Sequence, residues 1–134
     1  MKKLMIAAAN AAVLVLSLQA HAASQGVYFV EPKNGATVTS PFKVVFGIKG
    51  MTVDPAGEIK KNSGHHHLLI NAGPMKEGDV IPTDDTHMHF GKAQTEATVT
   101  LPKGKHTLQL VLGDWTHVPH NPPVVSEKIT VTVQ

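Results

Sequence analysis

The sequence predicts an all-β protein, and we expect an immunoglobulin-like antiparallel β-sandwich of about seven strands. Three observations support this prediction. Apolar and polar residues alternate in several short runs, which is the pattern of half-buried strands. Valine and threonine, which favour strands, are abundant in these runs. Turns rich in glycine and proline separate the runs, and no stretch after the N-terminal segment has convincing helical periodicity.

Each expected strand is an alternating or apolar run bounded by turn residues. Asn34-Gly35 and Lys103-Gly104 lie in two such turns, 32–35 and 102–105. The second turn joins two alternating runs, so we expect a tight hairpin there. The expected strands are 27–31, 42–48, 66–70, 86–90, 97–101, 108–112 and 129–133.

Residues 1–22 have the organisation of a secretory signal peptide. Lys2 and Lys3 precede an apolar stretch, and Ala20-His21-Ala22 supplies small residues at the two positions that a signal peptidase reads. The apolar stretch is too short to be a membrane anchor. We therefore expect cleavage after Ala22, a periplasmic location, a single domain over residues 23–134 and no membrane span after cleavage.

Composition excludes several classes of function. Without Lys2 and Lys3, ten lysines face ten acidic residues, and the chain has no arginine. Nucleic-acid binders depend on basic patches and arginine forks, so we exclude that class. The absence of cysteine excludes a disulfide, a thiolate metal site and a thiol nucleophile. No Gly-x-Ser-x-Gly motif is present either. We expect a non-enzymatic role, with a metal-dependent enzyme as the open alternative.

Histidine is the residue type that points to a function. Nine histidines are present, and most lie in three tight groups. His-x-His on a strand places both imidazoles on one face, roughly 6.5 Å apart along the chain, and this pattern occurs twice. A proline-stiffened loop carries the third group. The predicted metal ligands are His65, His67, His87 and His89, with His117 and His120 as candidates to close the site.

The ligand type limits the metal. Nitrogen ligation without sulfur in an exported protein favours a copper or zinc ion. Met51 and Met88 are candidate soft donors, although packing is the simpler role for both. Nearby carboxylates are candidate ligands or acceptors for an imidazole N–H, namely Asp84, Asp85 and Asp114.

Two histidines and the single tryptophan fit structural roles better. His66 shares a strand face with Leu68 and Ile70, so we expect a packed, hydrogen-bonded histidine. His106 begins the inward row of the 108–112 strand and has the same expected role. Trp115 is expected to be buried against the sandwich, because its apolar surface is large.

Several segments together resemble the bacterial family called domain of unknown function 4399. These segments cover nearly the whole chain after the signal, and they are 27–32, 64–70, 87–92, 102–110 and 117–120. The resemblance implies an exported, compact single domain and supplies no activity. From the residues themselves we expect a periplasmic domain that binds a transition metal for carriage, buffering or sensing. The alternative is a non-catalytic module of the cell envelope, with a protein partner, whose histidines form a metal-free polar network.

Overall fold

The computed structural model describes residues 26–134, so the expected signal peptide (1–22) lies outside the described residues. The described part contains nine strands and no helix, and hence no helix that could cross a membrane. The strands are β1 (Gly26–Glu31), β2 (Thr37–Val38), β3 (Phe42–Lys49), β4 (Thr52–Val53), β5 (Ser63–Ile70), β6 (His87–His89), β7 (Glu96–Val99), β8 (Gly104–Gly113) and β9 (Ile129–Val133).

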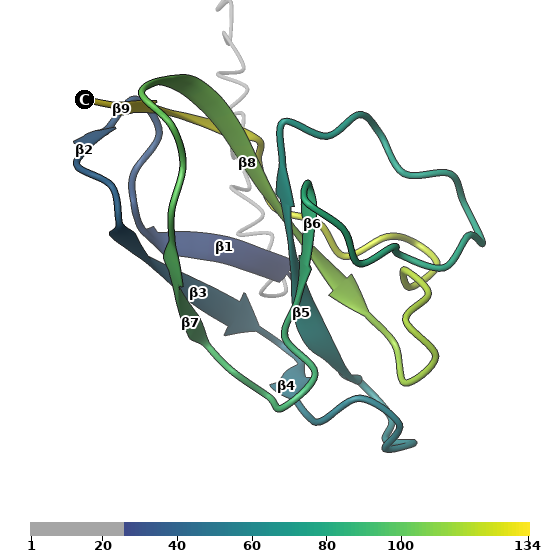
Figure 1. The fold of residues 1–134 in the computed structure, drawn as a ribbon. Helices are drawn as coiled ribbons and strands as arrows, with labels where there is room; N and C mark the ends of the chain where they lie inside the picture. The colour runs from purple at the N-terminus through teal and green to yellow at the C-terminus, as the bar shows by residue number, and fades with distance from the viewer. Residues whose placement is uncertain (1–25) are drawn as a thin grey trace, which may run out of the picture.

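Two sheets face each other, which confirms the predicted all-β sandwich (Figure 1). The smaller sheet has the order β1-β3-β7, and both of its pairings are antiparallel. The larger sheet has the order β2-β9-β8-β5-β4, with β6 also paired to β5. Seven strands have three or more residues, as expected, and the arrangement is consistent with an immunoglobulin-like layout. The two-residue strands β2 and β4 pair in parallel, so the larger sheet is mixed.

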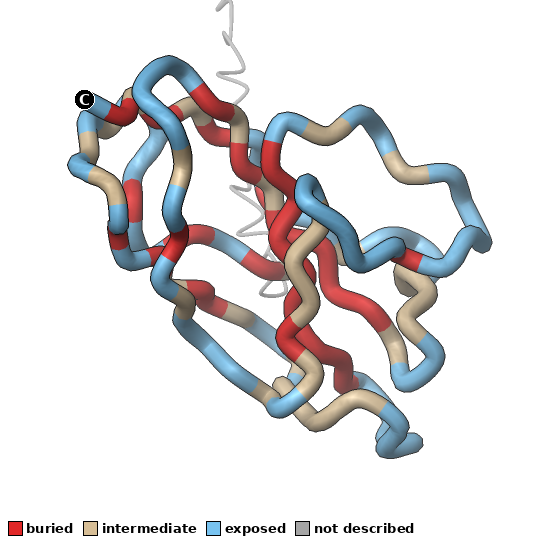
Figure 2. Tube along the Cα trace, in the orientation of Figure 1, coloured by how far each residue is buried: buried red, intermediate tan, exposed pale blue. Residues whose placement is uncertain are grey.

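The core lies between the sheets and follows from the alternation in the sequence. Val44 on β3 and Leu110 on β8 are fully buried, while their chain neighbours on β3 and β8 include exposed or half-buried residues. This period of two is what a strand with one face on a core requires. Strand β5 departs from the pattern because all eight of its residues are buried (Figure 2).

The predicted hairpin at residues 102–105 is wrong. Strand β7 pairs with β3 in the smaller sheet, whereas β8 pairs with β5 and β9 in the larger one. The turn therefore carries the chain from one sheet to the other. Val99 and Leu108, on either side of the turn, both contribute to the shared core. An alternating run shows that a strand has one buried face, but it does not identify the strand that pairs with it.

Two long segments cover the outer face of β5 and β8. One is the β5–β6 connection, and the other follows β8 (Figure 1). Ile81 from the first segment packs against Leu69 and Val111 of the sheet, which forms a small second apolar cluster. The second segment forms isolated bridges to β8 at Val125 and Pro119. Strand β5 is thus buried by the core on one face and by these segments on the other.

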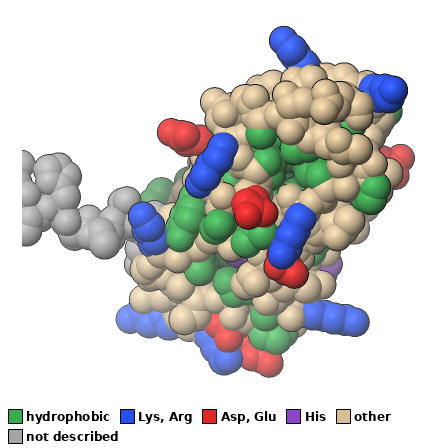
Figure 3. Space-filling model, turned by 90° about the vertical axis from the view of Figure 1, so that its left-hand side faces the viewer, with side chains coloured by type: hydrophobic (Ala, Val, Ile, Leu, Met, Phe, Trp, Pro, Cys, Tyr) green, Lys and Arg blue, Asp and Glu red, His purple; other side chains and the backbone are tan. Residues whose placement is uncertain are grey.

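The surface carries no block of a single charge on the face shown in Figure 3. Lysine side chains and acidic side chains are interspersed there among apolar and uncharged atoms. This distribution agrees with the near balance of charges in the sequence. It gives no electrostatic footprint of the kind that nucleic-acid binding needs on that face.

Candidate metal centre

The centre begins with two histidines on the outer face of β5. His65 and His67 lie opposite Gly113 and Val111 of β8, and both are fully buried. Their Nε2 atoms are 3.0 Å apart. Two imidazole lone pairs repel at that distance, so either one ring donates an N–H to the other or a cation lies between them. The alternation of a strand therefore brings the two rings together as the sequence predicts.

Strand β6 adds a third ring to the same face. His89 pairs directly opposite His67 in the antiparallel ladder, and cross-strand neighbours share a face. The ring centroid of His89 is 5.1 Å from that of His67 and 5.0 Å from that of His65. One nitrogen from each of the three rings lies within 4.8 Å of the others. These three histidines could hold a metal ion.

A fourth ring comes from the turn that follows β8. The Nε2 atom of His117 is 3.2 Å from that of His89, and its ring centroid is 4.9 Å from that of His65. The backbone of His117 has a φ of 66°, in the left-handed region that few residues other than glycine adopt. Such a conformation costs energy and persists only where its surroundings hold it in place.

Asp114 holds that turn. Its Oδ1 atom accepts hydrogen bonds from the backbone N–H of Thr116 (2.7 Å), the Thr116 hydroxyl (2.6 Å) and the backbone N–H of Val118 (3.0 Å). The N–H of His117 also donates to the backbone carbonyl of Asp114. The sequence analysis missed this role, although Asp-x-Thr is a recognisable signal for a turn of this type.

Two glycines make room for the rings, and the sequence analysis missed both. A Cβ atom at Gly113 would lie 2.8 Å from Nε2 of His67, closer than real Cβ atoms approach other atoms. A Cβ atom at Gly91 would collide with the ring of His89. Close approach of a ring to the backbone explains a glycine at each position. Nothing local in the sequence signals this, because the contact depends on the pairing of strands.

Burial keeps the clustered histidines neutral. Burial, followed by the neighbouring histidines, lowers the pKa of His65 to about 4 and that of His67 to about 3. Burial followed by His117 also lowers the pKa of His89. A nitrogen must be unprotonated to bind a metal, so these rings are ready to bind at neutral pH without losing a proton from a charged form.

The structure separates the other two predicted ligands from this group. His87 lies opposite Leu69, and its Nδ1–H donates to Oδ1 of Asp84 at 2.7 Å. Its ring makes none of the ring contacts that join the cluster. His120 is half-buried, and its Nε2 atom has no hydrogen-bond partner among the described residues. It lies near enough to His65 to lower that residue's pKa, but it is not one of the three converging histidines.

The other candidate ligands have structural contacts. Met51 and Met88 pack against the main core. Asp84 binds His87, and Asp85 is exposed. Trp115 is 46% exposed, so the expectation that it is buried is wrong. Trp115 lies in the Asp114 turn, two residues before His117, whose ring joins the cluster.

The two histidines assigned to structural roles differ from each other. The Nδ1 atom of His106 accepts a hydrogen bond from the side-chain amide N–H of Asn71 at 2.9 Å, and its Nε2–H donates to the Pro102 carbonyl at 2.7 Å, as expected of a structural histidine. His66 faces the core beside Phe46, with ring centroids 5.0 Å apart. Neither of its nitrogens has a hydrogen-bond partner among the described residues. It is packed as predicted, but it is not hydrogen-bonded.

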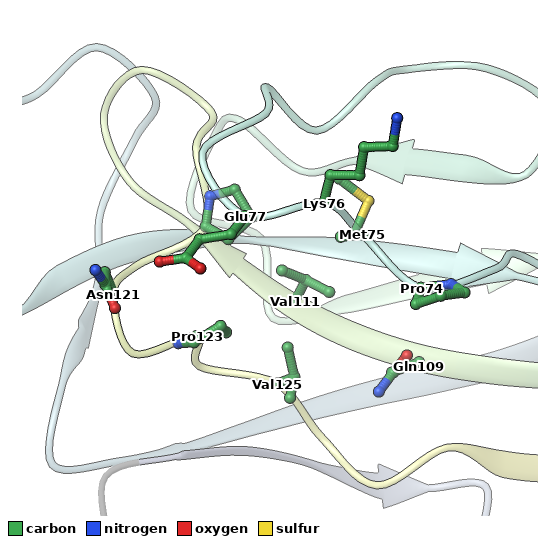
Figure 4. A pocket seen from close by; sticks show the side chains of 10 residues that line it. Pro74, Met75, Lys76, Glu77, Gln109, Val111, Asn121, Pro123 and Val125 are labelled. Carbon is green, nitrogen blue, oxygen red and sulfur yellow. The ribbon is translucent and has the colours of Figure 1, made fainter.

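A hollow of about 330 Å³ lies beside the centre on the outer face (Figure 4). Val111 of β8 forms part of its wall, with Met75 and Val125 from the covering segments. The ammonium end of Lys76 extends away from it in Figure 4. No histidine lines this hollow, so it adjoins the cluster without forming part of it.

The part of the chain that carries the histidine cluster matches a known protein family. Residues 44–134 match the family described as Domain of unknown function (DUF4399). The chain belongs to this family. The matched range contains every histidine of the cluster, and it excludes the resemblance noted at 27–32. No curated protein and no solved structure matches the chain. Any function therefore has to be argued from the geometry of the centre.

Proposed function

We propose that this exported protein binds one transition metal ion, copper or zinc, and serves in metal carriage, buffering or sensing in the periplasm. His65, His67 and His89 are the proposed ligands. The observation that supports this is the convergence of their nitrogens within 4.8 Å on one buried face. Neutral imidazoles from strands, with no sulfur ligand in the chain, suit either ion.

The surroundings of the rings support binding over a purely structural network. Within the described residues, neither structural histidine has a nitrogen contact with another histidine: His106 bonds to amide and backbone groups, and His66 packs against Phe46. The clustered rings instead contact one another through Nε2, at 3.0 Å between His65 and His67 and at 3.2 Å between His89 and His117. Unprotonated ring nitrogens this close repel one another. A cation bound by these Nε2 atoms would replace the repulsion with attraction.

The rigidity of the site supports a role in holding an ion. His65 and His67 lie on a strand that pairs with neighbours on both sides, β8 and β6. The ligands are therefore in place before the ion arrives, which reduces the entropy lost on binding. The chain has no cysteine nucleophile, and we propose no chemical reaction at this centre.

Native mass spectrometry of the mature protein, produced without a histidine tag and titrated with copper(II) and zinc(II), tests this proposal. We expect one ion to be retained at pH 7.5, with affinity falling as the pH approaches the lowered pKa of His65, about 4, where protons begin to compete for the rings. His89→Ala should lose the ion. His87→Ala is the matched control, since it removes a histidine two residues away whose ring lies outside the cluster.

Three results would count against the proposal. These are retention of no ion, equal loss in the two variants, or stronger binding at pH 5 than at pH 7.5. In the first case the histidines would form a metal-free network, and a search for an envelope partner would follow. Circular dichroism on both variants would confirm that they fold. N-terminal sequencing of protein recovered from the periplasm should begin at Ala23 if the chain is exported and cleaved as proposed.

A further inference from the structure

The position of His117 bears on the coordination geometry. The rings of His65, His67, His89 and His117 gather on the outer face of β5, and the six distances between their centroids describe the arrangement. The ring of His117 lies 4.9, 6.0 and 4.8 Å from those of His65, His67 and His89. The three strand-borne rings lie 4.8, 5.0 and 5.1 Å from one another. Five of the six separations are therefore close to 5 Å.

This set of distances distinguishes two coordination geometries. An imidazole that binds zinc at about 2.0–2.1 Å places its ring centre about 3.2 Å from the ion, so four tetrahedral rings would all be about 5.2 Å apart. In a square plane, four pairs would be about 4.5 Å apart and two opposite pairs about 6.4 Å apart. A plane in which His67 and His117 are opposite, at 6.0 Å, also requires His65 and His89 to be opposite, yet those two centroids are only 5.0 Å apart. The rings are thus arranged as a slightly distorted tetrahedron.

Two pairs of nitrogen atoms already lie near the spacing that four-coordination needs. A tetrahedral zinc ion separates its nitrogen ligands by about 3.3 Å. The Nε2 atoms of His65 and His67 are 3.0 Å apart, and those of His89 and His117 are 3.2 Å apart. These contacts form two opposite edges of the tetrahedron, one within β5 and the other between β6 and the Asp114 turn. Binding would require a few tenths of an ångström of expansion at these two edges, and it would draw together the nitrogens of His65, His67 and His89, which now spread over up to 4.8 Å.

We infer that His117 supplies a fourth ligand, so that the centre is a closed, tetrahedral four-histidine site of the kind that zinc prefers. This inference rests on the proposed function and adds the ligand number, the geometry and the class of ion. Four protein nitrogens leave no position for water or substrate, which is the mark of a site that holds an ion. Copper(II), which favours a flattened arrangement, would have to distort at these fixed rings.

The turn that carries His117 closes the site. The other three ligands come from paired strands, whereas His117 lies on a surface turn fixed by the carboxylate of Asp114. The carbonyl of His117 also accepts the N–H of Ile81, from the other covering segment. Removing the imidazole of His117 leaves a three-nitrogen site with one open position, which a small ligand from solution can fill.

Cobalt(II) is the probe that tests this inference, because four-coordinate tetrahedral cobalt absorbs visible light much more strongly than five- or six-coordinate cobalt. The full mature protein should give intense bands that do not change when imidazole is added in excess. His117→Ala should bind cobalt at least about tenfold more weakly, the equivalent of losing about 1.4 kcal/mol. Its spectrum should change on addition of imidazole. His120→Ala, the matched control on the same loop, should behave as the wild type.

Each arm has a result that would overturn the closed site. Weak bands in the wild type, or bands that respond to imidazole, would show an open coordination position, and this arm needs no variant to fold. Equal affinity and spectra for His117→Ala and the wild type would remove His117 from the ligand set. A loss confined to His120→Ala would transfer the role to that residue. If the wild type retains none of cobalt, zinc and copper, the proposed function fails as well, whereas retention of copper alone overturns only the closed tetrahedral site, so the two failures are distinguishable.

Discussion

The two faces of strand β5 present the same residue type in contrasting surroundings. His65, His66 and His67 follow one another and are all fully buried. The pleat sends His66 into the core beside Phe46, whereas its two neighbours face the outer loops among other imidazoles. Burial lowers the pKa of all three. Burial and a shifted pKa therefore do not distinguish a candidate ligand from a packed side chain in this protein.

The difference lies in the groups that surround each imidazole. His66 packs against Phe46 in the core, and its ring contacts none of the clustered histidines, which lie on the opposite face of the strand. The nitrogens of His65 and His67 face each other at 3.0 Å and lie close to a third and a fourth ring. Convergence of several donor atoms is what a metal requires.

The largest expected effect is a loss of stability in acid, to which both faces contribute. In the unfolded chain a histidine takes up a proton below its ordinary pKa of 6.5, whereas folded His65 and His66 do so only near pH 4 and folded His67 only near pH 3. The unfolded state therefore holds more protons between pH 6.5 and 4. Stability is fully present above pH 6.5 and is lost as the pH falls through this window.

At pH 5 the loss should be on the order of 2 kcal/mol for each of the three histidines in the metal-free protein. Urea unfolding at several pH values between 7.5 and 4.5 measures it. His66→Leu should remove about a third of the pH dependence, which assigns that share to the core face. A free energy of unfolding that does not change between pH 7 and 5 would contradict the burial argument for both faces.

The second prediction concerns the core face alone. Leu68→Ala removes a fully buried side chain next to His67 in sequence but on the opposite face. It should lower the free energy of unfolding by about 2–5 kcal/mol through the cavity that it leaves. Metal stoichiometry at pH 7.5 should stay at one ion, because no ligand is touched. Loss of the ion from a folded Leu68→Ala protein would show that the two faces are coupled.

The third prediction tests the cost of the unpaired nitrogens of His66. A buried polar group without a hydrogen bond costs about 1–3 kcal/mol. His66→Leu, a replacement of similar size, should therefore raise the free energy of unfolding by about that amount at pH 7.5 while metal binding is unchanged. Chemical denaturation and a zinc titration measure the two quantities. A large drop in stability would mean that the imidazole of His66 makes a contact that leucine cannot replace.

The sequence predicts the strands well because a strand with one buried face leaves a period of two in the chain. It does not predict which strands pair, and the expected hairpin at 102–105 failed for that reason. The same limit applies to the site. His-x-His spacing places two rings on one face, but the register between β5 and β6 decides that His89 lies opposite His67 while His87 lies opposite Leu69.

The remaining parts of the site depend on loop geometry that spacing does not encode. His117 joins the cluster because the carboxylate of Asp114 fixes a turn with a left-handed residue in it. His120, three residues later and equally conspicuous in the sequence, makes none of the ring contacts that join His117 to His65, His67 and His89. A pattern of histidines thus predicts that rings gather on one face more reliably than it predicts which histidines do so.

The smallest expected effect tests how closely the outer face fits its rings. Gly113→Ala places a methyl group 2.8 Å from Nε2 and 3.0 Å from Cδ2 of His67, so the ring has to move by a few tenths of an ångström. A displacement of this size in a rigid site should weaken metal binding by about tenfold, or about 1.4 kcal/mol. Gly73→Ala is the control, because nothing lies within 4 Å of its added methyl group. Competition titrations with a chelator of known affinity compare the two variants. Equal affinities would show that the ring of His67 moves freely, and the outer face would then be less preorganised than its strand pairing indicates.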